Sequence, residues 1–155
     1  MSALLLQLDS EAEQEALGAR LAACLEGPLL IFLEGDLGAG KTTLTRGFLR
    51  GLGHQGAVKS PTYTLIEPYQ IGARKIYHLD LYRVADAGEL EYLGLREMLD
   101  EAAVLLIEWA GRGEGWLPTP DLRITIHHRG EGREIELNAV TAAGKAVLSG
   151  LGLNL

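Results

Sequence analysis

The chain has 155 residues, of which 47% are hydrophobic and 23% are charged, values typical of a globular protein with a real core. Its formal net charge of −7 argues against a large basic surface that grips nucleic acid directly, so in a nucleic-acid pathway a partner would have to hold the polymer. The single cysteine, Cys24, excludes an internal disulfide framework and a metal site built from several cysteines.

The length and hydropathy of the chain limit the number of domains and of membrane-spanning segments that it can contain. A length of 155 residues predicts one domain, residues 1–155. No apolar stretch reaches the roughly 18 residues that a membrane-spanning helix needs. The first residues carry no positive charge before their short apolar run, which is unlike a secretory signal peptide. We therefore expect a cytoplasmic protein with no membrane partner.

The first predicted elements are a strand, a helix and a second strand. Residues 3–8 favour a short strand. Ser10 and Glu13 then form a capping-box pattern at the start of a helix, which ends at Gly27. Residues 29–34 form a continuous apolar run, typical of a strand buried on both faces of a parallel sheet.

The middle of the chain predicts a helix, a hairpin, another helix and another buried strand. A helix runs from about Lys41 to Gly53. Residues 62–70 and 75–83 have the composition of two strands joined by a short turn. A helical stretch broken near Gly94 leads to a second continuous apolar run at 103–109.

The last third of the chain predicts a loop, a hairpin and a short helix. Residues 110–120 are rich in Gly and Pro, and 122–128 and 133–140 alternate apolar and polar side chains around "RGEG". A helix begins near Thr141. The sum is an α/β fold with a mixed sheet, central parallel strands, added antiparallel hairpins and flanking helices.

The stretch "GDLGAGKT", residues 35–42, matches the phosphate-binding pattern G-x-x-x-x-G-K-[ST] without a departure. Its glycines let backbone N–H groups point at phosphate oxygens, its lysine reaches the β- and γ-phosphates, and its threonine hydroxyl coordinates magnesium. A buried strand precedes the pattern and a helix follows it, as the mechanism requires. The predicted α/β domain is therefore P-loop NTPase-like. The predicted ATP-binding residues are Gly35, Asp36, Leu37, Gly38, Ala39, Gly40, Lys41, Thr42, Thr43 and Trp109.

The base is predicted less directly than the phosphates. Guanine-binding relatives of such proteins usually carry an [NT]-K-x-D motif, and none occurs in this sequence, so ATP is the expected nucleotide. Trp109 or Trp116 can stack on an adenine ring; the alternative for either is a partly exposed packing role.

Two carboxylates are candidates for the acidic partner of the phosphate loop. Glu108 ends a continuous apolar run, and ligands of α/β sheets sit at the carboxyl ends of such strands. We therefore assign Glu108, with Thr42, to magnesium. Asp80 shares a strand face with Ile76 and His78, and we assign it to orienting or deprotonating the attacking water, so that Asp80 and Lys41 are the predicted catalytic residues. The alternatives are a turn or capping role for Asp80 and a salt-bridged edge role for Glu108, and which acid is the principal magnesium ligand stays open.

Residues 59–65, "KSPTYTL", form the remaining informative loop. Ser60, Thr62 and Thr64 offer hydroxyls that can contact the γ-phosphate or its magnesium, as switch loops of nucleotide hydrolases do. The alternative is a Ser-Pro turn that leads into a strand. Arg83 is a further candidate for the γ-phosphate, against a solvated role.

The four histidines of the chain show no metal-ligand spacing with a cysteine. We interpret His54, His78, His127 and His128 as structural or surface residues.

Four motifs together resemble one known family. In order they are "GDLGAGKTT", "SPTYTL", "HLDLYR" and "LLIEW", and with their spacing they are similar to TsaE (also called YjeE), the small bacterial P-loop ATPase. The resemblance covers nearly the whole chain. The first motif alone is shared by very many proteins, whereas the four in combination are specific to this family.

The resemblance implies a function in making N6-threonylcarbamoyladenosine beside the anticodon of tRNAs. It implies an ATPase that binds the TsaD–TsaB heterodimer in a nucleotide-dependent way and resets it by hydrolysis, with tRNA met only through that complex. It also implies residues 35–43 as the phosphate loop, Asp80 as the catalytic acid, Glu108 as the magnesium ligand and Trp109 beside the nucleotide.

Two other function classes stay open at this point. A small-molecule kinase would use the same phosphate loop, although it needs arginines that close over the transferring group. The candidates Arg112, Arg123, Arg129 and Arg133 are spread over a loop and a hairpin. A nucleotide-gated binding module with incidental hydrolysis would need every residue named above.

Overall fold

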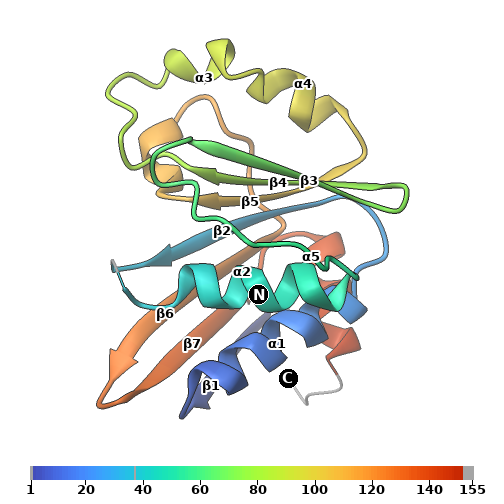
Figure 1. The fold of residues 1–155 in the computed structure, drawn as a ribbon, viewed down its shortest axis with the longest axis vertical. Coiled ribbons are helices and arrows are strands. Elements are labelled where there is room, and N and C mark those ends of the chain that lie inside the picture. The colour runs from blue at the N-terminus through green and yellow to red at the C-terminus, as the bar shows by residue number, and fades with distance from the viewer. Residues whose placement is uncertain (1, 37, 152–155) are drawn as a thin grey trace.

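The computed structural model describes residues 2–36 and 38–151. Seven strands, five α-helices and a short 3₁₀ helix follow one another in these residues (Figure 1). Their bounds are β1 Ser2–Leu8, α1 Glu11–Ala23, β2 Leu29–Gly35, α2 Lys41–Gly51, β3 Ile66–Ile71, β4 Arg74–Asp80, α3 Glu89–Tyr92, α4 Leu95–Asp100, β5 Ala103–Glu108, η1 Ala110–Gly113, β6 Leu122–Arg129, β7 Gly132–Ala139 and α5 Ala142–Gly150.

All seven strands form one mixed sheet in the order β1-β7-β6-β2-β5-β4-β3. The four central strands, β6, β2, β5 and β4, run parallel to one another. Antiparallel pairs close both edges, β7 with β1 on one side and β3 on the other. The predicted fold class is confirmed: parallel strands lie at the centre and hairpins are added to them.

Helices cover both faces of this sheet, and each face has its own apolar cluster. Side chains of α1, α2 and α5 pack with β2 residues Leu29, Ile31 and Leu33. Those of α3 and α4 pack with the intervening β2 residues, Leu30 and Phe32. Because successive strand residues point to opposite faces, a strand buried on both must be apolar throughout. This explains the unbroken apolar run from which β2 was predicted.

Helices α1 and α2 lie against each other on the same face of the sheet (Figure 1). Glycine allows this close approach, since a Cβ atom added to Gly47 would lie 2.1 Å from the backbone oxygen of Glu15. Ser10 caps the start of α1 and accepts from the N–H of Glu13 at 3.2 Å, as the capping-box pattern predicts. The approach places the first turn of α1 beside the start of α2.

Two details of the sheet differ from the sequence-based expectation. Strand β3 begins at Ile66, not at residue 62, because 61–64 form turns and Leu65 has a left-handed φ of 70°. Strand β6 does more than extend an edge, since it pairs in parallel with β2 and so belongs to the centre of the sheet. Local alternation of side chains carries no information about which strand lies alongside.

The helices that the structure describes include none long and apolar enough to cross a membrane.

Candidate functional site

The phosphate loop joins the end of β2 to the start of α2. Gly38 and Gly40 have φ angles of 78° and 112°, which residues other than glycine rarely adopt. Gly40 is also the N-cap of α2 and makes no side-chain capping bond. The first N–H groups of an 11-residue helix therefore face the loop, where an anion can accept from them.

Two side chains from distant parts of the sequence hold this loop. Arg133, in β7, donates from Nε to the backbone oxygen of Ala39 at 2.8 Å. Gln14, in α1, is buried and packs on Gly40 so closely that a Cβ atom there would lie 2.2 Å from its Oε1. The loop is thus shaped by its own glycines and by contacts across the fold.

Lys41 is buried, with 5% of its surface exposed, and its ammonium group meets three different partners. Nζ donates to the backbone oxygen of Gly35 at 2.8 Å and lies 3.7 Å from Oε1 of Glu108. It also lies 4.7 Å from the centre of the Trp109 ring, within the range of a cation–π interaction. These contacts fix a positive charge at the point where the phosphate loop meets β5.

Glu108 is the last residue of β5 and both its carboxylate oxygens have partners. Oε1 faces Lys41, while Oε2 lies 2.6 Å from Nε2 of His78. His78 is fully buried in the neighbouring strand β4. The carboxylate is therefore held in one orientation between a lysine and a histidine.

Asp80 ends β4 and is the direct register partner of Glu108. Its Oδ1 accepts from the backbone N–H of Tyr82 at 2.9 Å. Burial raises the pKa of this carboxyl above its ordinary value, and the negative charge of Glu108 raises it further, while the Tyr82 N–H and the charge of Lys41 act against them. A carboxylate with a raised pKa is a better proton acceptor than an ordinary aspartate.

The loop at 59–65 comes close to these acids. Ser60 and Thr62 share a hydrogen bond of 2.7 Å between their hydroxyls and both line the cleft described next. Thr64 instead donates to Glu67 at 3.0 Å, on the exposed side of the loop. The backbone oxygen of Leu65 accepts from the N–H of Asp80 at 3.0 Å, which ties the end of the loop to the acid.

A cleft of about 360 Å³ lies where these segments converge. Its lining brings together most of the predicted site residues, namely Gly38, Gly40, Lys41, Thr42, Thr43, Ser60, Thr62, Asp80 and Glu108. Gly35, Asp36 and Ala39 shape the loop without lining the cleft, and Leu37 falls outside the described residues. Segments far apart in sequence thus meet at one end of the sheet.

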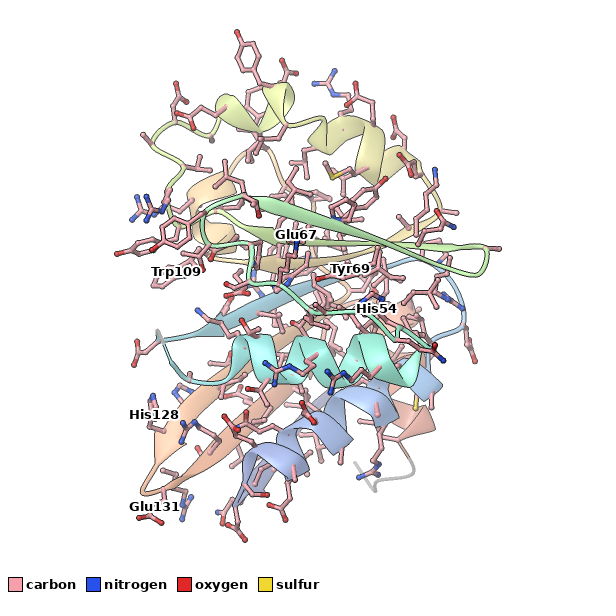
Figure 2. The ribbon with its side chains drawn as sticks, viewed as in Figure 1. His54, Glu67, Tyr69, Trp109, His128 and Glu131 are labelled. Atoms are coloured by element: carbon pink, nitrogen blue, oxygen red, sulfur yellow. The ribbon has the colours of Figure 1, made fainter. Side chains whose placement is uncertain are left out.

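The two tryptophans occupy different places. Trp109 lies at the end of the sheet toward which the arrows of β2, β4 and β5 point (Figures 1 and 2). Its backbone has a left-handed φ of 56°. The centre of its ring lies 4.9 Å from that of the Tyr82 ring, and the ring is beside Lys41. Trp109 does not line the cleft. Trp116 lies in a separate small pocket with residues of α3 and α4. Of the two tryptophans, Trp109 is therefore the one that contacts Lys41.

Residues outside the predicted set also contribute to the cleft. Glu11, Gln14 and Arg133 line it, although no motif in the sequence marks any of them. His78, which was interpreted as structural or surface, is fully buried and contacts Glu108. The other histidines fit that interpretation: His54 packs edge-on against Tyr69 at 4.9 Å (Figure 2), and His127 and His128 are exposed.

Comparison with known proteins decides among the families that share such a loop. The family model described as "Threonylcarbamoyl adenosine biosynthesis protein TsaE" matches residues 8–135. The chain belongs to the TsaE family. The resemblance drawn from the four motifs is thereby confirmed.

Individual relatives agree with the family model. A "tRNA threonylcarbamoyladenosine biosynthesis protein TsaE" from Haemophilus influenzae is 52% identical over 124 residues, which are 80% of this chain and 78% of the relative. The Bacillus subtilis protein of the same name is 45% identical over 129 residues, 83% of this chain and 80% of the relative. The crystal structure of Bacillus subtilis YdiB superposes with a TM-score of 0.82 at 36% sequence identity and covers 97% of this TsaE-family chain and 95% of its own.

Proposed function

We propose that this TsaE-family protein is a magnesium-dependent ATPase that serves the threonylcarbamoyladenosine modification of tRNA. It binds a TsaD–TsaB heterodimer in a nucleotide-dependent way and resets it by hydrolysing ATP. One observation carries the proposal: Lys41, Asp80 and Glu108 converge on the cleft beside the phosphate loop. The relatives' names supply the pathway.

The donors in the cleft suit magnesium. Thr42 offers a hydroxyl, and Glu108 offers a carboxylate held by its neighbours. Magnesium prefers hard oxygen ligands and is usually held by one or two protein groups together with substrate phosphates. When bound, the ion neutralises charge that builds on the β- and γ-phosphate oxygens. We assign Thr42 and Glu108 to it.

The other groups have separate tasks. Lys41 holds the β- and γ-phosphates as a point charge, and the first N–H groups of α2 donate to the same anion. Asp80 has one oxygen fixed by the Tyr82 N–H, and its other oxygen is free among the described residues to orient the attacking water and take its proton. ATP is the proposed nucleotide, with Trp109 near it.

A change of bound nucleotide can be transmitted to a partner protein through the 59–65 loop. Ser60 and Thr62 line the cleft, while the intervening Tyr63 is 80% exposed. The Arg83 guanidinium stacks on the Tyr63 ring at 4.6 Å. A hydroxyl that contacts the γ-phosphate would therefore move an exposed aromatic–arginine pair at the same time. We propose this pair as part of the nucleotide-sensitive partner surface.

The kinase alternative is less well supported by the positions of its arginines. Arg123 pairs with Glu34 at 2.6 Å, Arg129 pairs with Glu134 at 2.7 Å, and Arg133 donates to the phosphate loop backbone. Each already has a structural partner. A dependence of ATP turnover on an added metabolite, with no response to TsaD and TsaB, would favour the kinase.

The decisive experiment is gel filtration of the chain with TsaD and TsaB in the presence of a non-hydrolysable ATP analogue, ADP or no nucleotide. We expect co-elution that depends on which nucleotide is present. A Lys41→Ala variant is the matched control, and it should lose the nucleotide dependence. Absence of co-elution under all three conditions would contradict the partner proposal, while ATP hydrolysis by the chain alone tests the ATPase proposal separately.

A further inference from the structure

His78 lies on the same face of the sheet as both acids of the cleft. In β4, Ile76 packs in the cluster under α1 and α2, and His78 and Asp80 follow at alternate positions. In β5, Val104 and Leu106 pack in that cluster and Glu108 follows them. The imidazole is thus the first polar group met on this face between the apolar core and the cleft.

The register of the two strands explains the contact between His78 and Glu108. His78 is paired with Leu106, and Asp80 is paired with Glu108. The Glu108 side chain therefore reaches diagonally back toward His78, where Nε2 and Oε2 lie 2.6 Å apart. An ionised carboxylate can only accept, so Nε2 carries the proton and donates it.

This bond leaves the carboxylate with one oxygen committed and one turned to the cleft. Oε2 is held by His78, whereas Oε1 is 3.7 Å from Lys41. The other ring nitrogen of His78, Nδ1, has no hydrogen-bond partner among the described residues. His78 is fully buried, and buried polar groups are nearly always hydrogen-bonded. The bond to Glu108 is therefore what satisfies this imidazole among the described residues.

We infer that His78 is a positioning residue, which orients Glu108 so that Oε1 faces the metal and the phosphates. The inference rests on the proposed function, since it assigns a task only if Glu108 holds magnesium. Residues that hydrogen-bond to a metal-ligating carboxylate commonly change metal affinity by about 10- to 100-fold when they are replaced. His78 touches neither substrate nor metal and acts through Glu108.

The test measures magnesium affinity without relying on turnover. ADP binding is followed by calorimetry, first in a chelator and then over a series of magnesium concentrations. We expect His78→Leu to raise the magnesium concentration needed for half-maximal tightening about 10- to 100-fold. Magnesium-free ADP binding should stay near wild type, because Lys41 and the phosphate loop are intact.

A matched pair of amide variants separates positioning from simple loss of packing. The amide of His78→Gln can reach the place of Nε2 and should restore most of the magnesium affinity. His78→Asn carries the same amide on a side chain one methylene shorter and should not restore it. If His78→Leu does not fold, the Gln and Asn variants still decide. Equal behaviour of Gln and Asn would overturn the inference.

The double variant gives an independent readout. If His78 acts through Glu108, adding His78→Leu to Glu108→Gln should change magnesium affinity little further. Full additivity of the two changes would overturn the positioning role. If wild-type ADP binding did not respond to magnesium at all, the proposed function would fail together with this inference. A magnesium response that His78→Leu leaves unchanged would refute the inference alone.

Discussion

The ends of β4 and β5 present two acids side by side in register, yet their surroundings differ. Glu108 has both oxygens engaged, one facing Lys41 and the other bonded to His78. Among the residues that the structure describes, Asp80 accepts only the backbone N–H of Tyr82, and burial raises the pKa of its carboxyl. A held carboxylate suits a metal ligand, whereas a carboxylate with a free oxygen and a raised pKa suits a proton acceptor. The two roles are therefore proposed from the surroundings of each acid rather than from its position in the strand.

The surrounding elements reinforce this difference. Glu108 belongs to a strand whose described residues are all buried, so its backbone has little freedom. Asp80 is followed by the exposed pair Tyr82 and Arg83, and its N–H is bonded to the last residue of the 59–65 loop. Movement of that loop therefore reaches Asp80 more directly than Glu108.

The largest expected effect is on hydrolysis after Asp80→Asn. Removing a general base typically lowers the rate by about 10²- to 10⁴-fold, and we expect this for the single-turnover rate of ATP hydrolysis. Nucleotide affinity, measured by calorimetry, should change by only a few fold because Lys41 and Glu108 remain. A loss of binding as large as the loss of rate would break the division between the two acids.

The next effect is on magnesium, after Glu108→Gln. The amide keeps the shape of the side chain but loses the charge, so magnesium-dependent ADP binding should weaken by about 10- to 100-fold. The matched control is Asp80→Asn in the same titration, which should leave the magnesium requirement close to wild type. The reverse order of effects would make Asp80 the principal magnesium ligand.

The sequence predicted the central strands and picked out residues of the 35–43 loop and both acids, which line one cleft, because each signal depends on neighbours in the chain. Gly38 and Gly40 stand at fixed offsets from Lys41, and Glu108 ends an apolar run. The class of the fold and the family followed from the same patterns. These are short-range signals, which sequence alone preserves.

Contacts made across the fold could not be predicted in this way. Arg133 reaches the phosphate loop from a strand about a hundred residues away in sequence, and His78 meets Glu108 only because β4 and β5 are paired in one register. The start of β3 was placed too early because "TYTL" has the composition of a strand, while the left-handed φ of Leu65 ends the turn there. Pairing and backbone geometry, rather than composition, decided each case.

A smaller effect is expected when the Trp109 ring is removed. The ring lies 4.7 Å from the Lys41 ammonium, which Glu108 also contacts. A cation–π contact is worth about 0.5–2 kcal/mol, which corresponds to roughly 2- to 30-fold in affinity. Trp109→Leu should weaken magnesium-free ATP binding within that range, and Trp109→Phe should weaken it less. A change in hydrolysis rate without a change in affinity would place Trp109 with Asp80 instead.

The smallest effect concerns stability and pH in the nucleotide-free, magnesium-free protein. Because burial raises the pKa of Asp80, the folded chain binds this proton more readily than the unfolded chain. The contribution of Asp80 to the free energy of unfolding therefore falls as the pH rises from the ordinary pKa of aspartate through the raised pKa of the folded chain. Above that range the full cost of burying the charged carboxylate destabilises the folded chain. Asp80→Asn should accordingly be more stable than wild type at neutral pH in urea titrations, and the gap should close as the pH is lowered. A gap that is the same at every pH would show that the burial of a charge is not its cause, and would remove one of the two features that distinguish Asp80 from Glu108.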